Sequence, residues 1–167
     1  MSPSRRRGQT ALEALFILGI ILTGVVLIVP PYLDSSEETS IVVQVRNAAS
    51  DACAYLNTGV KMDDWLHEPL NEILEASNYS SSNFVLEGIS TSQSGNVVTV
   101  RVRIKSQKSS KFWENSGQQL DSIENGVKEY IIRYVLKANP SASRSGNAIL
   151  FGRKRAVINV EVSGEGS

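Results

Sequence analysis

The segment with the clearest chemistry is the Gly8–Gln9 peptide bond, which lies between a basic stretch and a single acid. The basic stretch consists of Arg5, Arg6 and Arg7. The acid is Glu13, one helical turn beyond Gln9. Hydrolysis of the Gly8–Gln9 bond would leave a new α-amine on Gln9, and this amine would be the cation nearest to Glu13 once the arginines are removed. The chemistry to expect is therefore proteolysis by another protein, followed by pairing of the amine with the carboxylate.

An apolar run follows Glu13 and extends from Ala14 to Val29 without a charged residue, with Thr23 as its only polar side chain. A helix that spans a membrane needs about 20 mostly apolar residues, and the stretch from Gln9 to Val29 meets this length if Glu13 is tolerated. A carboxylate inside a bilayer costs a few kcal/mol, so Glu13 needs a partner on its own or a neighbouring chain. Pairing between chains would neutralise both charges and set the axial register of packed helices.

The charges around this run predict its orientation in a membrane. The arginines precede the run, and the next basic residue is Arg46. Three acids lie between the run and Arg46: Asp34, Glu37 and Glu38. Because basic residues tend to stay on the cytoplasmic side, we expect the extreme N-terminus in the cytoplasm and everything after Pro30 outside.

Three interpretations of the N-terminal segment compete. A secretory signal peptide would carry a small-x-small cleavage site after its apolar core, and the sequence from Val29 to Asp34 has no such site. A permanent signal anchor explains the arginines and the apolar run but not the acid at Glu13. Cleavage after Gly8 explains all of these features.

The residues from Arg5 to Leu33 resemble the class III signal peptide of archaeal type IV pilins. In that family a membrane-embedded prepilin peptidase recognises the basic leader and cuts after the glycine that corresponds to Gly8. Gln9 would become the new N-terminus, and Glu13 corresponds to the acid of the helix. Many of these pilins have a serine two residues after the glutamine, where this sequence has Ala11. Archaellins share the processing but usually lack the acid, which favours a pilin.

The resemblance implies a structural subunit of a cell-surface filament, first inserted in the membrane as a precursor. Identical subunits would polymerise through the hydrophobic helix into a helical filament, with adhesion or surface attachment as the role. Its partners would be the membrane before assembly, prepilin peptidase and the pilus assembly machinery. The alternatives are a membrane-anchored, non-filamentous binding protein and a minor or priming pilin.

Pro30 and Pro31 stand at the outer end of the apolar run. Prolines just past a spanning segment commonly end or kink a helix. In the pilins that this chain resembles, a proline in this region bends or melts the filament helix. A helix kink at the two prolines is therefore expected.

The whole chain is predicted to have an α+β fold with the shape of a lollipop. We expect a cleaved leader at 1–8, then one long helix from Gln9 to Asn57, bent at the prolines. Its part at 9–33 is hydrophobic, and its part at 34–58 is amphipathic and lies on an extracellular head at 59–167. The amphipathic part carries an apolar stripe at helical spacing: Ile41, Val45, Ala48, Ala49, Ala52, Tyr55 and Leu56. Gly59 would end this helix.

The head also carries helical signals. Pro69 suits the first position of a short helix. A further helix is predicted through Leu120 and Val127, and Gly126 weakens this prediction because glycine is a poor helix former. The segment from Tyr130 to Lys137 would either finish that helix or form a strand, and we favour the strand.

Alternation of apolar and polar side chains predicts a mostly antiparallel sheet in the head. Alternation is clear from Val98 to Lys105, and Phe84–Ser90 is expected to pair with this strand through the turn at 92–96. A similar Ser-x-Ser-Gly-Asn turn at 143–147 predicts a second hairpin, because Gly-Asn supplies the positive φ that tight turns need. Alternation returns near the C-terminus, at 157–162.

The head offers several candidate surface residues. Asn78 begins an Asn-Tyr-Ser triplet, an acceptor for N-glycosylation in a segment expected outside the membrane. Two basic groups are expected on a solvated sheet face and in a turn: Arg101, Arg103 and Lys105, and Arg153, Lys154 and Arg155. The alternative for both is binding to DNA or another anionic surface. Trp65 and Trp113 are expected in the core, and the alternative for them, together with Tyr79, is an adhesive role.

Composition excludes several functional classes. Seventeen basic and seventeen acidic residues give a net charge of zero, so we expect no nucleic-acid partner. Loss of residues 1–8 would leave fourteen bases against seventeen acids, a net charge of −3. Cys53 and His67 are the only cysteine and histidine, which excludes an intramolecular disulfide, and we expect no zinc site because one chain cannot supply a cluster of thiolate or imidazole ligands. No phosphate loop, nucleophile elbow or His-containing triad is present, so we expect neither enzymatic activity nor a cofactor.

Overall fold

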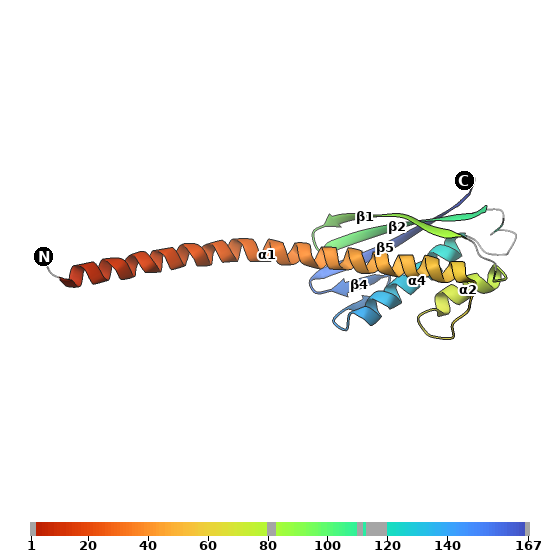
Figure 1. The fold of residues 1–167 in the computed structure, drawn as a ribbon, viewed down its shortest axis with the longest axis horizontal. Coiled ribbons are helices and arrows are strands. Elements are labelled where there is room, and N and C mark those ends of the chain that lie inside the picture. The colour runs from red at the N-terminus through yellow and green to blue at the C-terminus, as the bar shows by residue number, and fades with distance from the viewer. Residues whose placement is uncertain (1–2, 80–82, 110–111, 113–119, 166–167) are drawn as a thin grey trace. The chain divides into compact units, whose positions relative to one another are not determined.

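The structure is a computed structural model that describes residues 3–79, 83–109, 112 and 120–165. Within helices and strands it leaves the side chains of 3–11, 30–35, 109 and 165 undescribed. The chain divides into two compact units, Met1–Glu38 and Thr39–Ser167. The first is helical throughout its described part, and the second contains the sheet and the core (Figure 1).

Helix α1 (Pro3–Thr58) is a single helix of 56 residues. Its helical assignment continues through Pro30 and Pro31, so the two prolines do not end the helix; the expected kink stays a prediction. The helix does end where the sequence indicates, because Gly59 adopts a φ of +66°. A Cβ at this position would also lie 2.6 Å from the carbonyl oxygen of Tyr79, so glycine serves both the turn and a close backbone approach.

The second unit consists of a five-stranded sheet covered on one face by helices. The strands are β1 (Phe84–Ser94), β2 (Val97–Ser109), β3 (Ser143–Ser145), β4 (Ala148–Phe151) and β5 (Lys154–Glu165). The strand order is β1-β2-β5-β4-β3, and every neighbouring pair is antiparallel except β2 and β5, which are parallel. The predicted α+β class with a mostly antiparallel sheet is therefore confirmed.

The two predicted hairpins are present. Gly95 and Gly146 have φ values of +58° and +59°, and each lies in the turn between two paired strands, β1–β2 and β3–β4. The register of β1 against β2 shifts between Leu86 and Gly88, which places a bulge in β1. A further turn with Gly152 at φ +58° joins β4 to β5.

The core lies between the helices and one face of the sheet. Along β2 the side chains of Val98, Val100, Val102 and Ile104 are buried, and those between them are half-buried or exposed. The whole predicted stripe of α1, from Ile41 to Leu56, is buried against this core. Asn57 fixes the end of α1, because its side-chain amide donates to the carbonyl oxygen of Phe84 and accepts from its N–H, at 2.8 and 2.7 Å.

Two shorter helices complete this layer: α2 (Glu68–Ala76) and α4 (Leu120–Ala138). The predicted short helix is present, and it begins at Glu68, one residue before the expected first position at Pro69. The expectation of a strand from Tyr130 to Lys137 is wrong, because α4 continues to Ala138. Its apolar side chains follow the helical period and are buried on that face: Ile123, Val127, Tyr130, Ile131, Ile132 and Val135. Tyrosine and β-branched residues favour strands only weakly, and packing decides the outcome.

Candidate functional site

The residues from Leu12 to Val29 form a stretch of α1 that is long and apolar enough to cross a membrane. Its mean hydropathy is 2.7 over 18 residues, and none of the stretch is buried. A membrane-spanning helix and a signal sequence share these properties. Thirteen large apolar side chains here are between 44% and 73% exposed: Leu12, Leu15, Phe16, Ile17, Leu18, Ile20, Ile21, Leu22, Val25, Val26, Leu27, Ile28 and Val29. Such a surface needs lipid or other protein chains to cover it.

The apolar stretch contains one ionisable residue, Glu13, and its side chain is exposed. The single polar side chain of the run, Thr23, is satisfied within the helix because its hydroxyl donates to the carbonyl oxygen of Gly19 at 2.8 Å. Backbone bonding of this kind removes most of the cost of a hydroxyl in an apolar medium. Glu13 thus remains the polar group of this stretch that requires a partner outside it.

One side of the stretch is hollowed by small residues. A shallow groove of about 640 Å³ is lined by Leu15, Phe16, Gly19, Ile20, Thr23 and Gly24. A Cβ added to Gly19 or Gly24 would meet nothing within 4 Å, so the space beside both glycines is open. Small residues at such positions let a second helix approach closely in an apolar environment.

The structure places the predicted processing residues near the start of α1. Arg5, Arg6, Arg7, Gly8 and Gln9 all belong to this helix. Their side chains lie outside the described part of the chain, as do those of Pro30 and Pro31. Cleavage at Gly8–Gln9, leader recognition by the arginines, a register role for Glu13 and a kink at the prolines therefore remain predictions.

The first basic group, which we call the basic stripe, comprises Arg101, Arg103 and Lys105 of β2. All three are exposed on the face of the sheet away from the core, as the alternation predicts. The guanidinium of Arg101 lies 3.0 Å from a carboxylate oxygen of Glu161 on β5. The basic stripe is thus part of a solvated sheet face.

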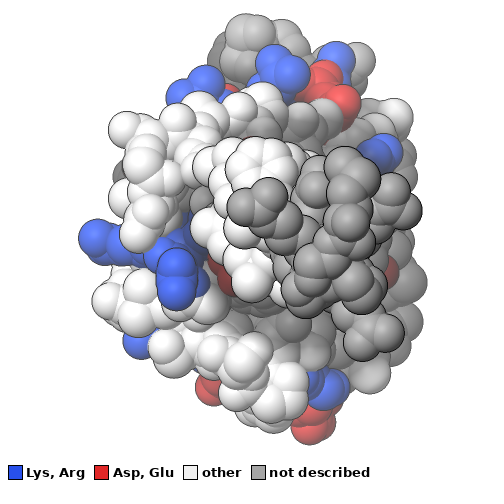
Figure 2. Space-filling model, turned by 90° about the vertical axis from the view of Figure 1, so that its left-hand side faces the viewer, with Lys and Arg blue, Asp and Glu red and all other residues white. Residues whose placement is uncertain are grey.

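The second basic group is only partly in a turn. Arg153 and Arg155 are exposed, but Lys154 is buried, with an exposed fraction of 4%. Strand β5 begins at Lys154. Because successive side chains of a strand point to opposite faces, Lys154 lies on the core face of the sheet and Arg155 on the outer face. Figure 2 shows one face of the molecule, where Lys and Arg lie in several separate places among uncharged residues, some of them beside Asp or Glu. The sequence alone missed the burial of Lys154, because alternation in β5 is apparent only from Ala156 onward.

The aromatic residues differ from expectation at one position. Trp65 is 54% exposed, so its predicted place in the core is wrong. Its ring lies beneath the guanidinium of Arg133, 5.8 Å from the ring centroid, and this cation–π contact replaces burial. Tyr79 is also exposed, and Trp113 lies outside the described residues.

Asn78 follows helix α2 and is exposed, with a φ of +50°. Its backbone N–H donates to the carbonyl oxygen of Glu75 at 3.0 Å, which holds the residue in the turn. Asparagine tolerates this left-handed conformation better than most residues. The side chain is accessible to a modifying enzyme, whereas Ser80 of the acceptor triplet lies outside the described residues; glycosylation at Asn78 remains a prediction.

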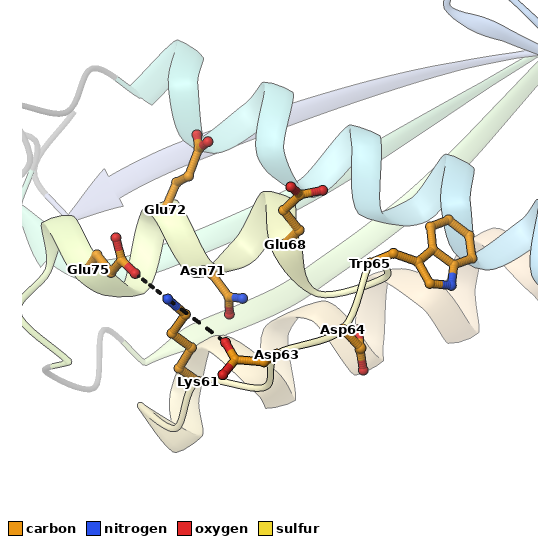
Figure 3. Close-up of a pocket in the computed structure, with 8 residues that line it drawn as sticks. All are labelled: Lys61, Asp63, Asp64, Trp65, Glu68, Asn71, Glu72 and Glu75. Atoms are coloured by element: carbon orange, nitrogen blue, oxygen red, sulfur yellow. Dashed lines mark hydrogen bonds and ion pairs between the residues drawn. The ribbon is translucent and has the colours of Figure 1, made fainter.

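A groove of about 450 Å³ runs along α2, with acidic residues on its walls: Asp63, Asp64, Glu68, Glu72 and Glu75. Figure 3 shows Lys61 between Asp63 and Glu75, at 4.0 and 2.7 Å from their carboxylates. The hydrogen bond to Glu75 raises the pKa of Lys61. Among the described residues, no group of three or more His, Cys, Asp or Glu side chains has the arrangement of a metal site.

A second groove, of about 490 Å³, is lined by residues of both α2 and α4. Arg133 of α4 crosses it, donating to Glu68 at 2.8 Å and to the carbonyl oxygen of Trp65. Arg144 holds Glu129 through two hydrogen bonds of 2.6 and 2.9 Å. The bond from Arg144, assisted by Arg133 and opposed by burial, lowers the pKa of Glu129. No local sequence pattern indicates this network, because its members come from α2, α4 and β3.

Cys53 and His67 occupy structural positions. Burial raises the pKa of Cys53 to about 11, so its thiol is protonated at neutral pH and is a poor nucleophile. His67 packs between the rings of Tyr55 and Tyr130, with centroid distances of 4.5 and 5.4 Å, and its Nδ1 lies 2.8 Å from Asp64.

Comparison of this chain with models of known protein families and with curated proteins found no match.

Proposed function

We propose that this protein is a structural subunit of an archaeal type IV pilus-like filament, cut between Gly8 and Gln9 and polymerised through the first half of α1. The observation that carries the proposal is the stretch of α1 from Leu12 to Val29, which has a mean hydropathy of 2.7 and is unburied. The basic leader and the Gly-Gln bond precede this stretch, and Glu13 is its one ionisable residue. Adhesion or surface attachment would be the role of the assembled filament.

Assembly would transfer the apolar stretch of α1 from one apolar environment to another. Before assembly, the bilayer covers the apolar stretch; afterwards, the helices of neighbouring subunits cover it. The groove beside Gly19 and Gly24 supports close helix packing. Glu13 supports assembly in a different way, because a desolvated carboxylate favours the neighbour that brings a cationic amine to it. The remaining, solvent-compatible unit from Thr39 to Ser167 would form the outer surface.

A permanent membrane anchor with a binding head is the second candidate. The same apolar stretch favours it equally, because an anchor also needs about 20 apolar residues. An anchor needs neither cleavage after Gly8 nor an acid in the apolar helix. These two features distinguish the candidates by experiment.

The first experiment identifies the N-terminal residue of the protein taken from its native surface. Mass spectrometry should find a chain that begins at Gln9. An intact N-terminus would contradict the filament proposal and favour the anchor. A start near Asp34 would show that the apolar stretch is an ordinary signal sequence and would contradict both.

The second experiment replaces Glu13 with glutamine in a strain with no other copy of the protein. Glu13→Gln keeps the shape of the side chain and removes its charge. In an anchor this change is harmless or slightly favourable, because the cost of an acid in lipid disappears. In a polymerising subunit the Gln9 amine loses its partner, and breaking such a desolvated pair costs about 3–5 kcal/mol, so we expect few or no filaments in electron micrographs.

The matched control is Glu38→Gln, the same change on the same helix outside the apolar stretch. It should leave filament number unchanged. Cleavage and membrane insertion of both variants are checked first by mass spectrometry and fractionation. Normal filament number and length in Glu13→Gln would mean that the acid does not set the register.

A further inference from the structure

We propose that successive copies of the chain also bind each other through their heads, with the basic stripe of one copy seated on the acidic groove beside α2 of the next. The inference rests on the proposed function, because a filament is what brings the copies together. It adds a second contact, distinct from the packing of the apolar helices. The occupant of the outer sheet face is therefore another copy of this chain.

The outer sheet face is suited to such a contact because it is unpartnered. No described element covers it, and the side chains of β2 on this face are exposed from Arg101 to Lys105. In the described part of the chain, Arg103 and Lys105 form no ion pair, whereas Arg101 binds Glu161. Val85, which pairs with Lys105 in the sheet register, is 50% exposed. The face thus combines the positive charge of Arg103 and Lys105 with apolar surface, and Glu161 lies opposite Arg103 in the sheet register.

The complementary face is formed by the two grooves on either side of α2, which we call the acidic groove surface. Its lining contains six acids against the two bases Lys61 and Arg133, and Arg144 binds one of these acids, Glu129, from outside the lining. The acids are Asp63, Asp64, Glu68, Glu72, Glu75 and Glu129. Trp65 lies at its edge with about half of its side chain exposed, and Figure 3 shows it beside the acids. Carboxylates and an exposed indole are the groups that best receive a guanidinium.

The two surfaces lie on opposite sides of the head. The buried side chains of β2 face the helices, so the basic stripe faces the other way, while α2 packs on α4 in the helical layer. A copy therefore cannot join its own two surfaces. When the basic stripe of one copy binds the acidic groove surface of the next, one basic stripe and one acidic groove surface stay free at the two ends of the row. Further copies can therefore add, and association continues as an open array. This is the geometry that a filament requires.

The test is zero-length cross-linking of intact filaments with a carbodiimide, which joins an amine to a carboxylate in direct contact. After digestion, mass spectrometry should find Lys105 linked to acids of the acidic groove surface. The Lys61–Glu75 pair, 2.7 Å apart within one copy, must be linked in the same sample and reports that the reagent has worked. The Lys105 links should weaken strongly in 1 M NaCl, because the screening length falls from about 8 Å to about 3 Å.

Two variants sharpen the test. Lys105→Gln should lower the salt concentration at which filaments lose head contacts, as followed by protection of the heads from protease. Lys137→Gln removes the same charge from the exposed end of α4, which belongs to neither surface, and should behave as the unchanged chain. Equal behaviour of the two variants would overturn the inference.

The failures of this inference and of the proposed function are distinguishable in one sample. Filaments with the Lys61–Glu75 link but without Lys105 links would overturn the head contact and leave the filament proposal intact. A Lys105 link to acids outside the acidic groove surface would also overturn it. Binding of the basic stripe to DNA or anionic vesicles, lost in Lys105→Gln, would identify a different partner. Absence of filaments in electron micrographs would overturn the proposed function itself.

Discussion

The hydroxyl of Tyr55 joins three parts of the head. It donates to the side-chain oxygen of Asn71 on α2 at 2.5 Å and accepts from the N–H of Met62 in the connecting loop at 2.8 Å. Asn71 in turn donates to the carbonyl oxygen of Met62 at 3.0 Å. The bond between Tyr55 and Asn71 is buried and the two bonds to Met62 are partly buried, so each of them reduces the cost of an unpaired polar atom. The network fixes the loop between α1 and α2.

Tyr55→Phe removes this hydroxyl and little else. Asn71 and the N–H of Met62 would each lose a partner, and we expect a loss of about 1–3 kcal/mol in the free energy of unfolding. Denaturant unfolding of the full chain in a mild detergent measures it. Tyr79→Phe removes the same oxygen from an exposed ring and should change the stability by less than about 0.5 kcal/mol. Equal effects in both variants would contradict the role of the network.

Cys53 provides a prediction about reactivity. Burial raises the pKa of its thiol to about 11, so at pH 8 only about one molecule in a thousand carries the thiolate that reacts. Iodoacetamide at pH 8 should leave the native protein unmodified and should alkylate it fully after unfolding, as mass spectrometry can show. The raised pKa also means that this group stabilises the fold below about pH 9 and that its contribution is lost as the pH rises toward 11. Rapid alkylation of the native chain would contradict the burial.

At the level of elements, the contact between α2 and α4 depends on a glycine. A Cβ at Gly126 would lie 2.8 Å from the carbonyl oxygen of Pro69 and 3.0 Å from the side chain of Ile73. The first distance is too short and involves backbone, which cannot swing aside. The poor helix former in the middle of α4 therefore allows the two helices to pack closely, and with them the two walls of the acidic groove surface.

Gly126→Ala would have two opposing effects on stability, because it raises the helix propensity of α4 and introduces a clash with α2. Alanine alone would favour α4 by about 1 kcal/mol, but the clash should cost more, and we expect a net loss of about 1–3 kcal/mol. Thermal unfolding of the full chain in detergent gives the sign. Asn125→Ala, on the exposed side of the same helix, should be neutral or slightly stabilising. A stabilised Gly126→Ala would show that α2 does not pack as tightly as described.

The elements also show how far the sequence determines the fold. Local periodicity was sufficient for the α1 stripe and for the hairpin of β1 and β2, because both depend on neighbouring residues. It failed from Tyr130 to Lys137, where strand-forming residues lie in a helix that packs one face on the core. The parallel pairing of β2 with β5 and the network around Glu129 join residues far apart in the chain, so no local pattern reveals them. For the N-terminal segment, the sequence predicts cleavage between Gly8 and Gln9, and the side chains of these residues lie outside the described part of the chain.

At the level of the whole molecule, the second unit holds a core of its own. Its buried residues run from Ile41 to Val162 and include none from the apolar stretch of α1. A core of this size is adequate for an independently folding domain. The stability of the head should therefore not depend on the N-terminal half of α1.

A fragment from Ser35 to Ser167 tests this independence. We expect a soluble protein with cooperative unfolding, because the fragment retains the whole α1 stripe and the sheet. Circular dichroism in rising denaturant measures the transition. A molten or insoluble fragment would mean that the core needs residues before Ser35.

The bulge at Leu86–Gly88 bears on how crowded heads avoid aggregation. Strand β1 is an edge of the sheet and is 11 residues long, so its outer side presents unpaired backbone groups to any neighbouring strand. The opposite edge, β3, has only 3 residues and offers little to pair with. Bulges and charged side chains interrupt edge-to-edge pairing, and Glu87 stands within the bulge of β1. At the high local concentration along a filament or in a membrane patch, this irregularity would keep neighbouring sheets from fusing into one.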